Sequence, residues 1–526
     1  MTYAPTVEQQ AVIDACAAGK AVVVEAAAGA GKTSTLRLAA GEMRGRVLYV
    51  AYNRAAADEA KASFPAHVRC STIHGLAFGA VGRDFSRRLG GRRVPAKVTA
   101  ERLGVRDNAE IGAGLTVTPV HIAKLALATV TRFCQSADLE VGKQHLPSVP
   151  GILTEAQLGR MHRKIPELRS AGEHQAAAEA HAAWDNGLRA RHDLARLVLP
   201  VAQRAWDDLT DRWGEQVPFA HDHYLKMWQI AGPRLSYDVV MLDEAQDSNP
   251  CRSALVVGQE HAQRIAIGDS CQQLYAWQGA VDALATWPAD VRLQLTQSWR
   301  FGGAVAAEAN KWLTLLGTDM RVRGNPNLPT VVGPIPTPDA ILCRSNAGAV
   351  GRVLAALEDG QRPALVGGAT ELVQLADAAG ELQAGKRTSH PELWAFESWT
   401  QVQEYAEEEQ GADLRVFVKL VDQYGPAKIT TALSRTVPED GADVVISTAH
   451  KSKGREWDRV AIADDFAEPK PDKDGNPRPV DKADAMVAYV AVTRARDALD
   501  RTGLAWVDRY VGPAAAITSA RKAPAA

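Results

Sequence analysis

Hydrophobic and polar positions alternate along the N-terminal part of the chain in the manner of an α/β protein. Short apolar runs at 21–25 and 46–51 flank a stretch with helical spacing at 32–42, and apolar runs return at 237–242 and 264–267. A continuous apolar run of this length between polar turns predicts a strand that is buried on both faces. Strands that alternate with helices predict a parallel sheet covered by helices. We therefore expect an α/β domain built from these separated segments.

A second unit of the same kind begins near Trp299. Its predicted strands lie at 340–343, 364–366, 444–447 and 459–463. Each unit is interrupted by a segment with helical spacing, of which the Ala-rich stretch 171–205 is the clearest part. The expected division is 1–78 and 236–298 for the first domain, 79–235 for its helical insertion, 299–368 and 441–510 for the second domain, 369–440 for its short helical insertion, and 511–526 for a disordered tail. The fold class is therefore α/β, with two parallel sheets.

The composition is typical of a globular protein and gives no sign of a membrane span. The chain has 526 residues, 46% hydrophobic and 23% charged, and no apolar run reaches the roughly 18 residues that cross a bilayer. Six cysteines without a CxxC pair, and an N-terminus with neither a basic head nor an apolar stretch, predict a cytoplasmic protein with no membrane partner. The net charge is −2, so a polyanion would have to be bound by locally concentrated positive charge.

A glycine-containing turn joins the strand that ends at Glu25 to the next helix. Its sequence is Ala26-Ala27-Ala28-Gly29-Ala30-Gly31-Lys32-Thr33-Ser34. The backbone N–H groups of such a loop can surround phosphates, the Lys32 ammonium can neutralise the β and γ phosphates, and the Thr33 hydroxyl can ligate Mg²⁺. Ala26 stands where glycine is usual, so a Gly/Ala-rich turn with a chance lysine is the alternative.

Two adjacent carboxylates follow the strand predicted at 237–242. Asp243 and Glu244 would lie at the C-terminal edge of the sheet, where parallel sheets bind ligands. We expect Asp243 to hold Mg²⁺ through water and Glu244 to orient and deprotonate the attacking water. A solvated strand end is the alternative for the pair alone, but the phosphate loop favours a nucleotide hydrolase. Kinases, transporters and GTPases share both elements, so these do not specify the substrate.

Six short segments follow one another along the chain: Thr6–Gln9, Asp243–Asp247, Gly268–Trp277, Ser298–Phe301, Thr448–Trp457 and Tyr489–Ala495. In this order they resemble the Q motif and motifs II, III, IV, V and VI of the UvrD/Rep-like helicases of superfamily 1. Four further segments are Val50–Arg54, Thr72–Ala77, His221–Trp228 and Trp299–Gly302. They are similar to segments of the F-box DNA helicase branch and its prokaryotic and viral relatives. No F-box is expected upstream of Gln9.

The resemblance implies two RecA-like P-loop domains with ATP and Mg²⁺ between them. It places Gln9 on the adenine edge, Trp299 on the adenine face, Glu456 on the ribose, Gln272 on the γ-phosphate, and Gly454 in the same site. Arg300 and Arg494 belong to the second domain, so they would reach the γ-phosphate as arginine fingers only when the cleft closes. Closure would couple hydrolysis to domain motion. A surface ion pair is the alternative for either arginine alone.

The strand-binding side should combine aromatic side chains with polar and cationic groups, because stacking on an aromatic ring tolerates any base. The candidates are Tyr52, Asn53, Thr72, His74, Tyr275, Trp277, Thr448 and His450. Core packing is the alternative for the aromatic residues, most evenly for Tyr275. The family usually has arginine after the tryptophan of motif III, and this chain has Gln278 there, so one expected contact is missing.

Two further features have competing interpretations. The densest basic stretch comprises Arg83, Arg87, Arg88, Arg92, Arg93 and Lys97. It either follows nucleic-acid phosphates or forms a solvated loop. The spacing of His221 and His223 would suit a metal site, but we expect none because only Asp222 lies between them to complete the ligands.

The resemblance implies an ATP-dependent 3′-to-5′ DNA helicase that acts on single-stranded DNA and 3′-tailed duplexes in repair, recombination or replication. The preference for DNA over RNA rests on the resemblance alone, since no group that reads a 2′-hydroxyl is identified. One alternative is a translocase that strips a recombinase or single-strand-binding protein from DNA with little unwinding. Another is an ATP-gated nucleic-acid sensor in a defence system. We expect a monomer.

Overall fold

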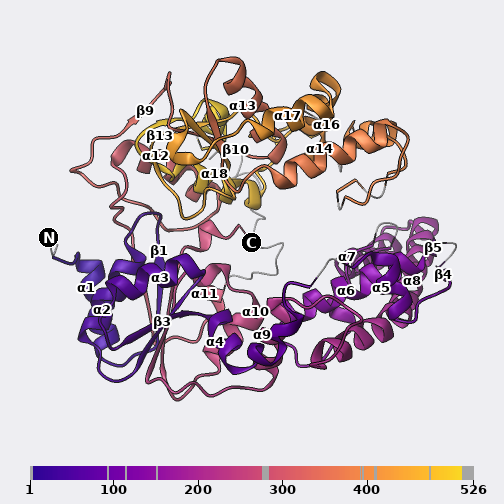
Figure 1. Ribbon diagram of the computed structural model, residues 1–526, viewed down its shortest axis with the longest axis horizontal. Helices are drawn as coiled ribbons and strands as arrows, with labels where there is room; N and C mark the ends of the chain where they lie inside the picture. Colours follow the sequence, from indigo (N-terminus) through magenta and orange to yellow (C-terminus); the bar gives the residue numbers. More distant parts are fainter. Residues whose placement is uncertain are drawn as a thin grey trace.

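The computed structural model describes residues 4–91, 94–112, 115–149, 152–274, 283–390, 392–393, 396–407, 412–472 and 475–511. Two six-stranded sheets form the centres of two α/β domains, one above the other in the view of Figure 1. Neighbouring strands are parallel throughout both sheets. The predicted fold class, two RecA-like domains with parallel sheets, is confirmed.

The first sheet has the strand order β3-β2-β6-β7-β1-β8. Its strands are β1 (Val22–Ala26), β2 (Val47–Ala51), β3 (Val68–Thr72), β6 (Val239–Leu242), β7 (Gln263–Gly268) and β8 (Val291–Leu295). The four central strands coincide with the four strands predicted from apolar runs, whereas the edge strands β3 and β8 are not predicted from the sequence. The connecting helices are α1 (Val7–Ala17), α2 (Lys32–Glu42), α3 (Arg54–Ser63), α10 (Pro250–Val257) and α11 (Ala283–Thr286).

The second sheet has the strand order β11-β12-β10-β13-β14-β9. Its strands are β9 (Val331–Val332), β10 (Ala340–Cys343), β11 (Pro363–Leu365), β12 (Val444–Thr448), β13 (Trp457–Ile462) and β14 (Ala495–Asp500). Its helices are α12 (Gly303–Leu315), α13 (Asn346–Glu358), α18 (Lys482–Val492) and α19 (Asp508–Val511). The four predicted strands are β10 to β13, and they are four adjacent strands of the six.

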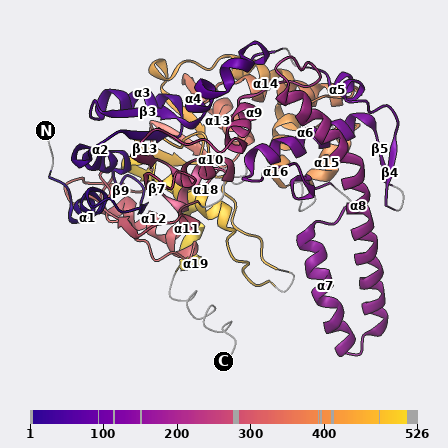
Figure 2. The ribbon, with the colours of Figure 1, turned by 90° about the horizontal axis from the view of Figure 1, so that it is seen from below.

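A long, mainly helical segment lies between β3 and β6. Its helices are α4 (Ile73–Ala80), α5 (Ala96–Arg102), α6 (Pro119–Gln135), α7 (Glu155–Ser170), α8 (His174–Thr210) and α9 (His221–Ile230). It also holds an antiparallel pair that the sequence does not predict, β4 (Ala109–Ile111) and β5 (Leu115–Val117). Figure 2 shows α7 and α8 as a hairpin that extends away from the rest of the molecule.

A second helical segment lies between β11 and β12, as the sequence predicts. It consists of α14 (Thr370–Gln383), α15 (Trp399–Glu407), α16 (Ala412–Tyr424) and α17 (Pro426–Ser434). Its buried side chains share a core with α13 of the second domain, for example Leu375 and Val421 with Val353. None of the helices in the described residues is long and apolar enough to cross a membrane.

Buried apolar side chains of the two domains form one continuous cluster. It includes Val24 and Leu36 from the first domain, and Val305 and Val490 from the second. Ala28 of the phosphate loop is fully buried in the same cluster. This shared core fixes the loop at the seam between the two domains.

Candidate active site and nucleic-acid interface

The phosphate loop joins the end of β1 to the start of α2. Gly29 and Gly31 have φ angles of 71° and 76°, which glycine adopts without strain. Space also requires glycine at position 29, because a Cβ there would lie 2.8 Å from Arg300 Cβ. The Ala28 N–H donates to the Tyr489 hydroxyl at 3.1 Å. Groups of the second domain therefore close over the loop.

Lys32, the first residue of α2, forms an ion pair with Glu244. Its Nζ lies 3.3 Å from Glu244 Oε1. Burial alone would lower the pKa of Lys32, but Glu244 and neighbouring carboxylates outweigh burial and raise it. Burial alone would raise the pKa of Glu244, but Lys32 and Lys453 hold that pKa at about 2. Glu244 also has φ 49°, the one positive φ of a non-glycine residue in the described part of the chain, and such strain concentrates at functional sites.

Asp243 directly follows β6 and receives two hydroxyl groups on Oδ2. Thr33 Oγ1 lies at 3.0 Å and the Tyr49 hydroxyl at 2.5 Å. Burial raises the pKa of Asp243, and the charge of Glu244 raises it further. Carboxylate and hydroxyl oxygens are the ligands that Mg²⁺ prefers, and a divalent cation would offset the buried negative charge. Thr33 and Asp243 therefore fit the predicted magnesium site.

Arg494 lies just after α18, and its guanidinium is buried at the seam. Its Nη2 donates to Gln272 Oε1 at 3.2 Å, and its Nε donates to Val490 O at 2.9 Å. Gln272 belongs to the first domain, where its Nε2 donates to Asp269 Oδ2 at 2.7 Å. Burial, with the nearby charge of Arg300, lowers the pKa of Arg494 to about 9, so the group stays cationic at neutral pH. Two of the predicted γ-phosphate ligands are therefore in direct contact.

Arg300 lies beside the phosphate loop but is paired with Glu456. Its Nε donates to Glu456 Oε2 at 2.5 Å, and its Nη1 donates to Thr493 O at 2.9 Å. The family resemblance assigns Arg300 to the γ-phosphate and Glu456 to the ribose. A contact between Arg300 and a phosphate would replace this ion pair.

Gln9 and Trp299 are far apart in the sequence, but both side chains lie beside Gly31. A Cβ at Gly31 would lie 3.4 Å from Trp299 Cδ1 and 3.5 Å from Gln9 Nε2. Gln9 is buried and donates to Thr35 Oγ1 at 3.0 Å, whereas Trp299 is 41% exposed and so can receive a flat ligand. Three further residues are predicted to bind the nucleotide. Ala30 is buried in the phosphate loop, Ser34 is exposed on α2, and Gly454 is exposed and has a φ of 80°.

Lys453 and Tyr489 belong to motifs V and VI but have no individually predicted role, yet both cross the seam. Lys453 Nζ lies 2.5 Å from Asp247 Oδ2 and 2.5 Å from Gln272 O. The Tyr489 hydroxyl lies 3.3 Å from Asp269 Oδ2. Their motifs provided a signal, but no sequence pattern shows which residues of a motif reach the opposite domain.

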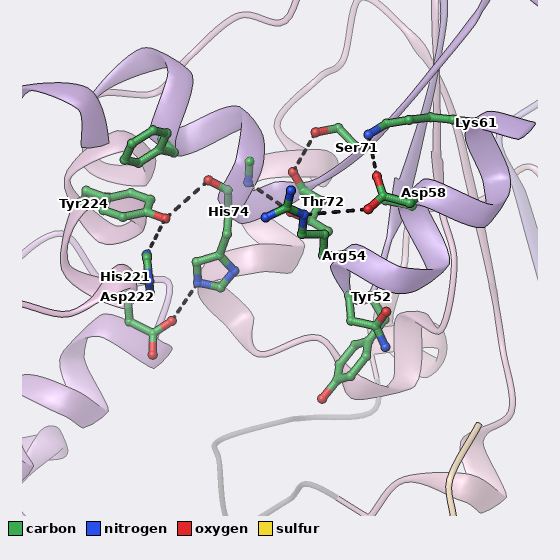
Figure 3. A pocket seen from close by; sticks show the side chains of 14 residues that line it. Tyr52, Arg54, Asp58, Lys61, Ser71, Thr72, His74, His221, Asp222 and Tyr224 are labelled. Carbon is green, nitrogen blue, oxygen red and sulfur yellow. Dashed lines mark hydrogen bonds and ion pairs between the residues drawn. The ribbon is translucent and has the colours of Figure 1, made fainter. Parts of the chain in front are cut away.

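The predicted strand contacts of the first domain line one groove of about 730 Å³, here called the α3–α4 groove (Figure 3). Its lining includes Tyr52, Asn53, Arg54, Lys61, Thr72, His74, His221 and Asp222. Asn53 caps α3 by accepting the Ala56 N–H at 2.9 Å, and Thr72 caps α4 by accepting the Gly75 N–H at 3.0 Å. Two helix N-termini therefore border the groove, and such termini favour anions.

His74 is held in the groove by α9. Its Nε2 lies 2.9 Å from Asp222 Oδ1, and the Tyr224 hydroxyl, which contacts His221 Nδ1 at 2.9 Å, donates to the His74 carbonyl at 3.5 Å (Figure 3). The hydrogen bond from His74 lowers the pKa of Asp222. This pairing fixes the orientation of the imidazole in the lining of the groove.

Thr448 and His450 of the second domain line a separate pocket of about 420 Å³ with Arg344 and Lys451. Burial lowers the pKa of His450, which favours its neutral form. The structure therefore brings the predicted strand contacts together as two groups, one in each domain. Tyr275, Trp277 and Gln278 lie outside the described residues.

His221 and His223 form hydrogen bonds at the N-terminus of α9. The His223 Nδ1 accepts the Ala220 N–H at 2.9 Å, which caps the helix, and His221 bonds the Tyr224 hydroxyl. No group of three or more His, Cys, Asp or Glu side chains in the described ranges could hold a metal ion. Both histidines therefore have structural partners.

The fold and the site define a class, P-loop proteins whose nucleotide loop is closed by a second parallel-sheet domain. The sequence profile of the UvrD/REP helicase N-terminal domain matches residues 6–285, and that of the UvrD-like helicase C-terminal domain matches residues 383–500. The chain belongs to the UvrD/REP helicase family.

Two relatives lie in the predicted branch of this family. The F-box DNA helicase protein 1 of Schizosaccharomyces pombe is 28% identical over 527 residues, covering 91% of this chain and 55% of the relative. The F-box DNA helicase 1 of Gallus gallus is 29% identical over 521 residues, covering 91% of this chain and 47% of the relative. The resemblance to the F-box DNA helicase branch is confirmed, although the chain spans about half the length of these relatives.

Proposed function

We propose that this protein is an ATP-dependent DNA helicase that moves along single-stranded DNA from 3′ to 5′. Its family, and two relatives whose names describe DNA helicases, support the reaction class. The observation that carries the proposal is the seam, where Arg494 of the second domain contacts Gln272 of the first and Arg300 packs against Gly29. Groups needed for hydrolysis come from both domains, so each nucleotide cycle changes how the domains pack.

The proposed domains keep the boundaries expected from the sequence: 1–78 with 236–298 and 299–368 with 441–510 as motor domains, and 79–235 and 369–440 as insertions. Thr33 and Asp243 hold Mg²⁺, which neutralises phosphate charge when bound. Lys32 exchanges its Glu244 partner for a phosphate. The released Glu244 carboxylate then orients the attacking water and accepts its proton.

The remaining predicted residues act around the transferred phosphate and the base. Arg494 and Arg300 neutralise the charge that develops on the γ-phosphate, and Gln272 reports its presence to the strand-binding side. On the nucleoside, Gln9 bonds the adenine edge, Trp299 stacks on its face and Glu456 bonds the ribose after releasing Arg300. Arg300 thus exchanges a carboxylate for a phosphate, which makes its approach to the nucleotide dependent on ATP.

Single-stranded DNA is proposed to lie in the α3–α4 groove and to continue past Thr448 and His450. Tyr52 offers a ring for base stacking, and the N-termini of α3 and α4, with Arg54 and Lys61, offer positive charge to phosphates. Each domain then holds its own part of the strand, so a change in domain packing moves one part relative to the other. Partners proposed beyond the strand are 3′-tailed duplexes and a recombinase or single-strand-binding protein.

The test combines ATP turnover with strand separation. We expect turnover to rise with single-stranded DNA more than with single-stranded RNA, and unwinding of a 3′-tailed but not a 5′-tailed duplex. The Lys32→Ala variant should lose turnover and keep strand affinity, because the groove is formed by other residues. Turnover that single strands leave unchanged would overturn the proposal. Displacement of a bound recombinase without unwinding would favour the protein-stripping alternative.

A further inference from the structure

The turn that follows α8 presents an exposed tryptophan, Trp213. Its side chain is 71% exposed, more than any other tryptophan in the described ranges. A single exposed apolar side chain is common and by itself implies no ligand. Here the backbone that carries the ring, and the charge beside it, add independent reasons to expect one.

The turn is held rigidly by a buried ion pair between Arg88 and Asp208, whose groups lie 2.9 Å apart with 7% and 3% of their side chains exposed. The Arg88 Nη1 also donates to the carbonyls of Asp208 at 2.6 Å and Asp211 at 2.7 Å. The Trp213 N–H donates to Asp211 Oδ1 at 3.0 Å. Gly214 leaves no room for a side chain, since a Cβ would lie 2.2 Å from Asp208 O. The ring is therefore exposed on a preorganised support.

Arg87 supplies an unneutralised cation next to this ring. Its Cζ lies 5.4 Å from the centre of the Trp213 ring. The neighbouring Arg88 is neutralised by Asp208, and Arg212 is neutralised by Asp84 at 2.5 Å. Among the residues that the structure describes, no carboxylate lies within ion-pair distance of Arg87. The basic stretch thus contains both structural and available arginines, and Arg92 and Arg93 lie outside the described residues.

The residues that line the hollow around Trp213 are close in sequence to residues that line the α3–α4 groove. The hollow has a volume of about 360 Å³ and is lined by Arg87, Trp213 and Phe219, among others. Only the exposed Ala220 separates Phe219 from His221, which lines the groove. The other wall is continuous too, because α4 leads directly into the 3₁₀ helix η1 (Gly82–Arg88). Two segments therefore connect the hollow with the proposed strand site.

We propose that Trp213 and Arg87 form a further nucleic-acid subsite, the Trp213 subsite. In it Trp213 stacks on a base of single-stranded DNA, and Arg87 binds the adjoining phosphate where the strand leaves the α3–α4 groove. An exposed indole next to an available guanidinium is the combination that binds single strands without reading sequence. The inference rests on the proposed function and lengthens the strand site beyond the residues that the family motifs contain.

The experiment measures the affinity of oligothymidylates of increasing length for wild type, Trp213→Ala and Trp213→Phe, without nucleotide. Trp213→Ala should bind the longest oligomers about tenfold more weakly and the shortest ones as wild type does, while Trp213→Phe should restore most of the affinity. Log affinity falls as log salt concentration rises, and Arg87→Ala should make this negative slope shallower by about 0.7, the value for one phosphate contact on a single strand. Arg362→Ala is the matched control, because Arg362 is an exposed arginine beside β11 in the other domain.

Unchanged affinity of Trp213→Ala at every length would overturn the Trp213 subsite. A loss that is equal at all lengths would also overturn it, since the change would then lie in the groove or in folding. A salt slope of Arg87→Ala equal to that of Arg362→Ala would remove Arg87 from the subsite. Failure of the wild type to bind any oligomer is a different result, because it would overturn the proposed function and the subsite together.

Discussion

The ammonium group of Lys453 stands between the two domains, 2.5 Å from Asp247 Oδ2. Burial raises the pKa of Asp247 to about 6, although Lys453 opposes this rise. The same ammonium helps Lys32 to hold down the pKa of Glu244. A lysine from the second domain therefore contributes, after Lys32, to keeping the proposed base of the first domain charged.

Lys453→Ala is expected to move the acidic limb of the pH profile of DNA-stimulated ATP turnover to higher pH. Without the ammonium the pKa of Glu244 rises, so the base becomes protonated earlier as the pH falls. The measurement is kcat against pH for wild type and variant. Lys428→Ala removes an exposed ammonium that pairs with Glu358 at 3.6 Å, and it should leave the profile unchanged. An acidic limb at the wild-type position in Lys453→Ala would refute this role.

Asp222 is expected to act as a positioning residue for His74. Asp222→Asn should raise the DNA concentration for half-maximal ATP turnover roughly fivefold, the equivalent of one hydrogen bond of about 1 kcal/mol, and leave kcat at saturating DNA unchanged. His74→Ala should have a similar effect, and the double variant should add little to either. Asp443→Asn is the control, since Asp443 is a carboxylate outside the groove, before β12, and pairs with Arg362 at 2.9 Å. Additive effects of the two changes would show that Asp222 does not work through His74.

Several site residues could be predicted from the sequence because their roles are local. Lys32 and Thr33 follow from a strand, a glycine loop and a helix in succession, and Asp243 and Glu244 follow from the end of a buried strand. The ion pair between Arg300 and Glu456 could not be predicted, since it joins segments 156 residues apart. Its formation depends on how the second domain packs, and the hydrophobic pattern carries no such information.

At the level of elements, the hydrophobic pattern predicted the strands that consist of an apolar run, including the edge strand β11. It missed the edge strands β3, β8 and β9 and the interior strand β14, which have no such run. β2 is buried at all five positions, whereas the edge strand β8 alternates between partly buried and exposed residues. β14 carries charged residues within Ala495–Asp500 and pairs with β13 with a register shift. A continuous apolar run marks a strand that is buried on both faces, whereas a strand with polar or charged positions is defined by the neighbours with which it pairs.

The start of α9 is expected to make the protein less stable in mild acid. His223 Nδ1 accepts the Ala220 N–H, and burial lowers the pKa of His223 to about 4, with Asp222 opposing this and Arg88 adding to it. The unfolded chain takes up this proton near pH 6.5, so the free energy of unfolding should fall as the pH drops from about 6.5 to about 4. Above about pH 6.5 the histidine is neutral in both states and contributes no slope.

The measurement is the free energy of unfolding against pH for wild type and His223→Gln. The glutamine variant should show a shallower slope between about pH 6.5 and about pH 4, because it removes the titrating group from both states. His192→Gln, at an exposed histidine of α8, is the control and should retain the wild-type slope. Parallel curves for wild type and His223→Gln would contradict this account of the helix cap.

At the scale of the whole molecule, the two domains are joined by a shared apolar core and by polar contacts, two of which lie at the phosphate loop and motif III. Tyr489 reaches the Ala28 N–H, and Arg494 reaches Gln272. Bound ATP would insert its phosphates among these groups, so nucleotide binding and domain packing compete for the same atoms. In the proposed function, this competition would link ATP hydrolysis to movement of the domains.

Arg494→Ala is expected to bind ATP with nearly wild-type affinity and to hydrolyse it on the order of 10³-fold more slowly, because an arginine finger acts mainly on the transition state. DNA unwinding should fall by the same factor, since each step requires one hydrolysis event. Nucleotide affinity, single-turnover hydrolysis and unwinding are measured on the same preparation. Arg496→Ala is the matched control, because Arg496 lies two residues further on and pairs with Asp458 at 3.2 Å.

The guanidinium of Arg494 also fills a buried position, so the thermal midpoint must be measured for each variant. Arg494→Lys keeps a cation there but lacks the planar fork that bridges Gln272 and a phosphate, and it should fold like the wild type while remaining slow. Slow hydrolysis in a stable lysine variant therefore separates the catalytic role from packing. A well-folded Arg494→Ala that hydrolyses ATP near the wild-type rate would show that the seam holds the domains together without coupling them to the nucleotide.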